Sequence, residues 1–176
     1  GASAFSGCSS LATCVLPART TVIGDNAFEG CAALTNAAFD QINLAPAAAL
    51  TSLGANAFSG CTSLTFFTFY SSLTSIGNAP LNGCTKMYSV IVKSSTISSL
   101  LLQGCTPALL EIGPAITNIP DNLFANNTVL GSVTFIDPTI LTRIGANAFG
   151  GCTALTAINV PDCVTTIGAG AFAGCS

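Results

Sequence analysis

The stretch IGANAFGGCTALT, residues 144–156, is one of several near-copies of a single phrase. The variants IGDNAFEGCAALT and LGANAFSGCTSLT begin at Ile23 and Leu53, and IGAGAFAGCS closes the sequence. A phrase that recurs in this way is the mark of a repeat architecture, in which each copy is one structural unit. The spacing of the copies therefore has to be established before any local structure is predicted.

The cysteine of the Gly-Cys pair gives that spacing. It falls at residues 8, 31, 61, 84, 105, 152 and 175. The interval after Cys105 hides one degenerate copy, IPDNLFANNTVL, in which Asn127 takes the cysteine position. The unit is thus about 23 residues long, and about seven residues around QINLAPAA are inserted between Cys31 and Cys61.

Each unit has two apolar parts. In the first, an apolar residue after the cysteine is followed by others three and five positions later and often by proline, as in LTAINVP at 155–161. This alternation predicts a short strand with one buried face. The second part is Ile-Gly-x-x-Ala-Phe-x-Gly-Cys, whose glycines predict tight turns with positive φ. Asparagine recurs two residues before the apolar Phe position, and we expect its side chain to cap a single helical turn there; these residues are Asn26, Asn56, Asn122 and Asn147.

One such unit cannot bury its own apolar face, so the copies must stack into a continuous core. The strands of successive units then pair in parallel about 4.8 Å apart. We expect residues 1–176 to form a single solenoid domain of about eight coils, with one short parallel strand per coil plus turns or short helical turns. Neither end shows a polar capping unit, which favours a segment of a longer array or ends covered by neighbouring repeats or subunits.

The pattern L-x-x-I-x-V-P…V-T-x-I-G-x-x-A-F-x-G-C-x-x-L resembles the BspA-type (treponemal) leucine-rich repeat. The best copies are residues 145–175, 24–34 and 54–64. The resemblance implies a leucine-rich-repeat solenoid in an extracellular or cell-surface protein that mediates adhesion and protein–protein contact. Copies around Leu81, Leu102 and Phe124 depart from the pattern, and we expect the register to be weaker there.

The composition argues against several classes of function. With four Lys plus Arg in 176 residues, no basic patch for nucleic acid can be built. No apolar run reaches the length of a transmembrane segment. The absence of histidine excludes Ser-His and Cys-His catalytic pairs, and the seven acidic residues are scattered over different coils and repeat positions. The sequence predicts no enzyme, no cofactor and no metal site.

Seven of the nine cysteines share one repeat position and should form a column along the core. A free cysteine behaves there as a small buried hydrophobe, although neighbouring coils stack closely enough for a disulfide. Cys14 takes an apolar strand position and should be buried. Cys163 follows a strand and is either covered by the next coil or an accessible thiol. Separately, Asn126-Asn127-Thr128 forms an N-x-T sequon, so Asn126 is a candidate glycosylation site or a chance match.

The exposed face of the strands is the candidate binding surface. Most residues predicted to point outward are small, but the middle coils offer Phe66, Tyr88 and Ile91, with Glu111 and Tyr70 nearby. Exposed aromatic residues on a rigid surface are typical of binding hot spots. These residues predict that the face binds a partner protein or a surface glycan. The alternative is an architectural subunit of a filament, sheath or membrane-associated complex, which the 6% content of charged residues favours.

Overall fold

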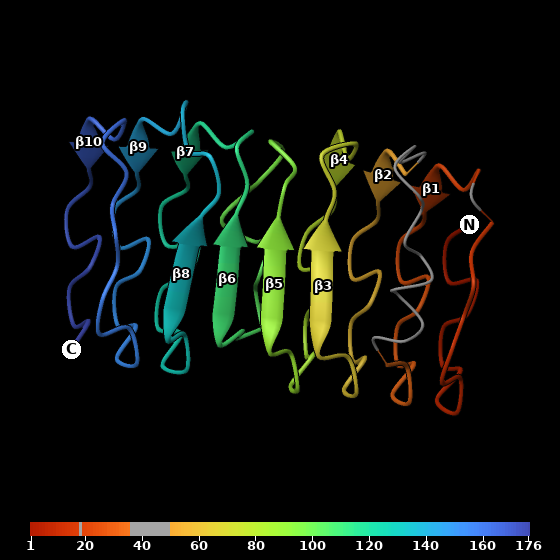
Figure 1. Cartoon of the computed structure of the whole chain (residues 1–176). Helices are drawn as coiled ribbons and strands as arrows, with labels where there is room; N and C mark the ends of the chain where they lie inside the picture. Colours follow the sequence, from red (N-terminus) through yellow and green to blue (C-terminus); the bar gives the residue numbers. More distant parts are fainter. Residues whose placement is uncertain (18, 36–49) are drawn as a thin grey trace.

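The computed structural model describes residues 1–17, 19–35 and 50–176. In these ranges the chain winds into an elongated solenoid that carries short, parallel strands (Figure 1). The strands are β1 (Val22–Ile23), β2 (Ser52–Leu53), β3 (Phe66–Phe69), β4 (Ser75–Ile76), β5 (Ser89–Val92), β6 (Leu109–Ile112), β7 (Asn118–Ile119), β8 (Ser132–Phe135), β9 (Arg143–Ile144) and β10 (Thr166–Ile167).

The longer strands form one sheet, the main sheet, in the order β3-β5-β6-β8. Its register is continuous, so Phe66, Ser89, Leu109 and Ser132 lie in one row across the four strands. The two-residue strands form two smaller parallel sheets, β1-β2-β4 and β10-β9-β7. In Figure 1 the main sheet lies below these two groups of short strands, which are separated from each other in the middle of the solenoid.

Alternation along the longer strands places one face in the core. Val90 and Val92 of β5 are buried, whereas the alternate residues Ser89 and Ile91 are only partly covered. The same pattern holds in β3 and β6, as the sequence predicts. Behind the sheet, phenylalanines of successive coils stack face to face, with ring centroids 4.9–5.4 Å apart; the pairs are Phe5–Phe28, Phe28–Phe58, Phe124–Phe149 and Phe149–Phe172.

The Ala-Phe phrase, or the residues that replace it in the degenerate copies, forms a compact turn in every described unit, and we call this five-residue piece the turn segment. Alternate N–H groups of one turn segment donate to C=O groups of the next, as Ser3, Phe5 and Gly7 do to Asp25, Ala27 and Glu29 at 2.7–2.8 Å. Coil is thereby joined to coil through backbone alone. The described residues contain eight turn segments, numbered first to eighth: 3–7, 26–30, 56–60, 79–83, 100–104, 122–126, 147–151 and 170–174.

The recurrent asparagine does not cap a helical turn, contrary to our expectation. The described turn segments are turns without helix, and the asparagine adopts left-handed φ values of 49–59°. Asparagine tolerates this region better than other non-glycine residues. The glycine of the Gly-Cys pair has positive φ as predicted, for example 72° at Gly30 and Gly60.

The glycine of the Ile-Gly pair has a different role from the one we expected. Its φ is not in the left-handed region. Instead, successive coils approach each other so closely at this position that a side chain has no room. A Cβ atom on Gly145 would lie 2.6 Å from the Asp121 nitrogen and 2.7 Å from the Ile119 oxygen. Glycine is therefore needed for backbone contact between coils.

The solenoid class and the spacing of about 23 residues are confirmed, but the expected single strand in every coil is not. About five turns form the regular β-solenoid, fewer than the eight coils expected. Residues 11–16 and 155–160 match the strand pattern and yet form no strand. A groove of about 340 Å³, lined by Val133 and Phe135 of β8 and by Asn159, lies where the unpaired segment 155–160 follows the sheet. Conversely, the short strands before the Ile-Gly glycines were not predicted.

The cysteines line the core behind the turn segments. The thiols of Cys31, Cys61, Cys84, Cys152 and Cys175 each donate to the carbonyl of the Phe in the preceding coil at 3.1–3.3 Å. Burial raises the thiol pKa to about 12 at Cys84 and Cys105 and to about 11 at Cys152. Cys14 is only partly buried against the core edge, and the half-buried Cys163 donates to the Pro138 carbonyl.

The close approach at Gly145 predicts a large effect of one methyl group. We expect Gly145→Ala to lower the free energy of unfolding by about 1–3 kcal/mol, because its Cβ meets backbone that cannot move aside. The matched control is Gly131→Ala, whose Cβ finds no atom nearer than the Ala154 oxygen at 3.7 Å. Thermal and urea unfolding of both variants measure the difference, and equal stabilities would contradict the role assigned to the Ile-Gly glycine.

The buried thiols predict selective alkylation. At about pH 8, iodoacetamide should modify the exposed Cys8 first and leave Cys61, Cys84, Cys105 and Cys152 untouched in the folded protein. Unfolding in guanidinium should expose every thiol to the reagent. Peptide mass spectrometry at several times locates the label, and early modification of Cys84 would show that the column is open to solvent.

Candidate partner-binding face

The outward side of the main sheet is a continuous surface made of alternate residues from four strands. We call it the outer strand face. Its rows follow the register, which joins Phe66 to Ser89 and Leu109, and Thr68 to Ile91 and Glu111. Adjacent positions in a row lie about 4.8 Å apart. The complete set is Phe66, Thr68, Ser89, Ile91, Leu109, Glu111, Ser132 and Thr134, with Tyr88 just before β5.

Four of the five predicted partner-binding residues lie together on this face. Tyr88 is 57% exposed, and its backbone N–H donates to Thr65 beside Phe66 at 2.7 Å. Phe66 and Ile91 are half-buried and stand on neighbouring strands, while Glu111 is the direct register partner of Ile91. The structure thus forms one compact group of an exposed phenol, a second aromatic ring, an aliphatic side chain and a carboxylate.

The fifth residue, Tyr70, directly follows the end of β3 and is partly buried. It lines a cavity of only about 20 Å³ with Thr68 of the outer strand face and with Phe67 and Leu73. Sequence reasoning also missed Leu109, which occupies the same row as Phe66. The sequence could have identified Leu109, because Leu110 and Ile112 fit the buried strand positions and place Leu109 on the outer side.

Two of the four cationic side chains in the sequence flank β5. Lys86 precedes Tyr88, and Lys93 directly follows the strand; both are exposed. They are two of only four Lys and Arg residues in the sequence. The outer strand face therefore combines apolar and aromatic surface with a cation on each side and a single carboxylate, Glu111.

Asn126 and Asn127 have different environments. Asn126 is exposed with a φ of 60°, and Thr128 is exposed as well, so glycosylation of the sequon stays a prediction. Asn127 is 4% exposed and satisfies its amide internally. Its Nδ2 donates to the Pro107 carbonyl at 2.9 Å, and its Oδ1 accepts from the Val129 and Leu130 nitrogens.

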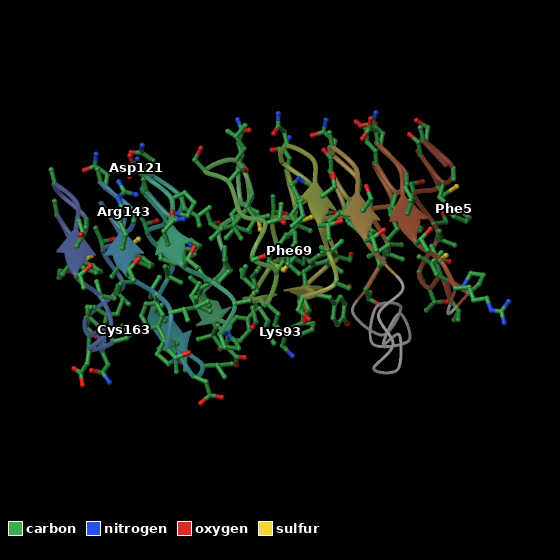
Figure 2. All side chains as sticks on the ribbon, turned by 90° about the horizontal axis from the view of Figure 1, so that it is seen from above. Phe5, Phe69, Lys93, Asp121, Arg143 and Cys163 are labelled. Atoms are coloured by element: carbon green, nitrogen blue, oxygen red, sulfur yellow. The ribbon has the colours of Figure 1, made fainter. Side chains whose placement is uncertain are left out.

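Two of the acidic side chains accept hydrogen bonds from the backbone of the next coil. Asp25 and Asp121 each accept a hydrogen bond from the N–H of a residue in the next coil, Ala55 and Ala146. Hydrogen bonds from the Arg143 guanidinium and from Ala146 lower the pKa of the Asp121 carboxyl. Figure 2 shows Asp121 and Arg143 together on one long edge of the molecule, across from Lys93. Among the described residues, no three Cys, Asp or Glu side chains gather to bind a metal.

Comparisons with known proteins agree with this architecture. The family model described as BspA type leucine rich repeat region matches six copies over residues 1–106 and 51–176. No match is found among the curated proteins. Within the part of the chain that the structure describes, no helix has the length and hydrophobicity of a membrane span.

Two solved structures are similar. A leucine-rich repeat protein from Eubacterium ventriosum is 32% identical with a TM-score of 0.63, over 72% of this chain and 34% of its own. A leucine rich cell surface protein from Faecalibacterium prausnitzii is 26% identical with a TM-score of 0.60, over 92% of this chain and 44% of its own. The chain thus spans less than half the length of either neighbour. By its repeat sequence and its solenoid, the protein belongs to the BspA-type leucine-rich-repeat family.

Proposed function

We propose that this chain is a non-catalytic adhesion module of a cell-surface or secreted protein and that it binds a partner protein through the outer strand face. The observation that carries the proposal is the group formed by Tyr88, Phe66, Ile91 and Leu109 on a rigid parallel sheet. Aromatic side chains supply large contact area with few rotatable bonds, so their ordering on binding costs little entropy.

The surroundings of this group fit a binding surface. Small residues such as Ser89, Ser132 and Thr134 separate the larger side chains, so a partner can approach the sheet closely. Lys86 and Lys93 on either side of β5 favour a partner that carries acidic groups at the matching positions. The sheet positions all of these side chains in advance, which limits the reorganisation that binding requires.

The similar structures and the residue composition support the location outside the cell and the non-catalytic role. One similar structure is that of a cell surface protein, which supports placement of this chain outside the cell. The sequence contains no histidine, and its carboxylates are used in backbone hydrogen bonds or lie apart. These features support a binding role over catalysis. A surface glycan is the second class of ligand that this face would take.

A different role, as an architectural subunit, is favoured by the scarcity of charge. Only 6% of the residues are charged, and such a surface can pack closely against other subunits. Sedimentation of the purified chain distinguishes the two roles. A soluble monomer supports the adhesion module, whereas concentration-dependent assembly into filaments or sheets supports the architectural subunit.

Removing the exposed phenol should weaken partner binding without unfolding the chain. We expect Tyr88→Ala to reduce affinity by about 2 kcal/mol, roughly thirtyfold, as for aromatic hot spots. Ile167→Ala on β10 is the matched control, because Ile167 is 55% exposed and lies on another sheet. Binding of both variants is measured by surface plasmon resonance on a panel of immobilised extracellular glycoproteins, intact and deglycosylated.

The two arms of this experiment separate the ligand classes. Loss of binding by Tyr88→Ala on both intact and deglycosylated targets supports a protein partner, and loss of all binding on deglycosylation supports a glycan. Circular dichroism and thermal unfolding verify that the variants are folded. Equal binding of Tyr88→Ala and the unsubstituted chain would refute a role for this face.

A further inference from the structure

Backbone hydrogen bonds between neighbouring turn segments are absent at one junction. Three such bonds join the first to the second segment, and three also join the second to the third, the third to the fourth, the sixth to the seventh and the seventh to the eighth. Two join the fourth to the fifth, from Ala79 to Leu100 and from Gly83 to Gly104. Between the fifth and sixth segments, both fully described, there is none.

The groups that would form this missing set are identified by the other junctions. The equivalent donors on the fifth segment are the N–H groups of Leu100, Leu102 and Gly104, and Leu100 donates to the Ser98 hydroxyl at 3.4 Å. The equivalent acceptors are the C=O groups of Asp121, Leu123 and Ala125. In the described structure neither the Leu102 and Gly104 donors nor these three acceptors are engaged in a backbone hydrogen bond. Backbone groups left in this way need a partner, either solvent or a ligand.

A cleft lies at this junction. Its volume is about 250 Å³, and its walls include Leu102 and Gly104 on one side and Leu123 and Ala125 on the other. The opposite side of the coil stays closed, because β6 and β8 remain paired through Leu110 and Val133. The cleft is therefore a wedge that opens between two turn segments and ends at the core.

The lining of the cleft determines which ligand chemistry it can accept. No charged side chain is present, and the polar side chains are hydroxyls and amides, namely those of Ser99, Gln103, Thr106, Asn122 and Asn127. An ionic ligand would lose its hydration there without gaining a counter-charge. Donors stand on one wall and acceptors on the other, so the ligand must both accept and donate hydrogen bonds.

We propose that this cleft binds an extended, uncharged peptide segment of small residues, whose backbone completes the interrupted set of hydrogen bonds. At the five junctions with three hydrogen bonds, the equivalent groups bind the backbone of a neighbouring coil, so a peptide backbone is their demonstrated partner within the molecule. Peptide C=O groups would accept from Leu102 and Gly104, and peptide N–H groups would donate to Leu123 and Ala125. This mode adds a backbone segment to an open edge.

The size of the cleft limits the side chains of the ligand. Its volume is below the range of about 300–1,000 Å³ that is usual for drug-sized ligands, so only a short run of Gly, Ala, Ser or Asn fits. Such residues also dominate the turn segments of this chain. The cleft shares no residue with the outer strand face, so the two sites are independent.

The probe for this site is the blocked peptide acetyl-Gly-Ala-Asn-Ala-Gly-amide, titrated into the intact chain labelled with ¹⁵N. We expect saturable shifts at Leu102, Gly104 and Ala125 with a dissociation constant below about 1 mM. Amide hydrogen exchange gives a direct readout: the Leu102 and Gly104 amides should exchange rapidly in the free chain and slow down in the complex. Gly83 is the internal control, because its N–H already donates to Gly104 at 2.9 Å.

Two substitutions form a matched pair. Ala125→Phe places a ring in the cleft and should weaken peptide binding at least about tenfold. Ala173→Phe makes the same change at the equivalent, exposed position of the eighth segment and should leave binding unchanged. A peptide N-methylated at alternate residues should also fail to bind, since it lacks the donors that the hydrogen bonds require.

Several outcomes would overturn the proposal. These are absence of saturable shifts up to several millimolar, undiminished binding to Ala125→Phe with a normal circular dichroism spectrum, or equal binding of the N-methylated peptide. Displacement of the peptide by a neutral oligosaccharide at lower concentration would assign the cleft to sugars instead. Tyr88→Ala should bind the probe normally, so failure at the cleft and failure at the outer strand face are distinguishable.

Discussion

The structure depends on the backbone hydrogen bonds that join each turn segment to the next. A turn segment has no helix and no long strand. Some of its amide groups bond within the turn, as Glu29 does to Asn26, and the others need the neighbouring coil or water. This requirement brings the coils close together and excludes a side chain from the Ile-Gly position, as at Gly145. It also demands left-handed conformations in every unit, which Asn and Gly accept at low cost. The repeated phrase is thus the set of residues compatible with this backbone contact.

The same spacing explains the core and the unusual composition. Coils in contact bring equivalent side chains together, so phenylalanine rings stack at about 5 Å and the buried thiols of Cys31, Cys61, Cys84 and Cys152 reach a carbonyl of the preceding coil. A charge repeated at one position would face an identical charge at the same short distance, which is unfavourable. Asp25 and Asp121 are followed in the next coil by Ala55 and Ala146, which donate to them. Low charge is therefore a consequence of close stacking as well as a feature of the surface.

Sequence periodicity predicted which strand residues point into the core, and it missed the features that depend on contacts between coils. It placed Val90 and Val92 inside and Ile91 outside, because alternation follows directly from strand geometry. It could not show that 155–160 stays unpaired, since the same pattern accompanies paired strands elsewhere. The outer residues of the candidate site were likewise predicted from their positions in the repeat. The small cavity that Tyr70 lines with Phe67 and Leu73 depends on packing that no sequence pattern reveals.

The interruption between the fifth and sixth turn segments lies where the repeat departs from its own pattern. The fifth unit lacks the Ile-Gly pair, and the sixth has Asn127 in place of cysteine. A cysteine donates to the carbonyl of the turn segment in the preceding coil, whereas the longer Asn127 amide reaches past that segment to Pro107. The sixth coil is thereby anchored toward the strand side, where β6 and β8 pair, and is not held at the turn side. Regular copies hold the solenoid together, and the degenerate copies create the places where its backbone is open to a ligand.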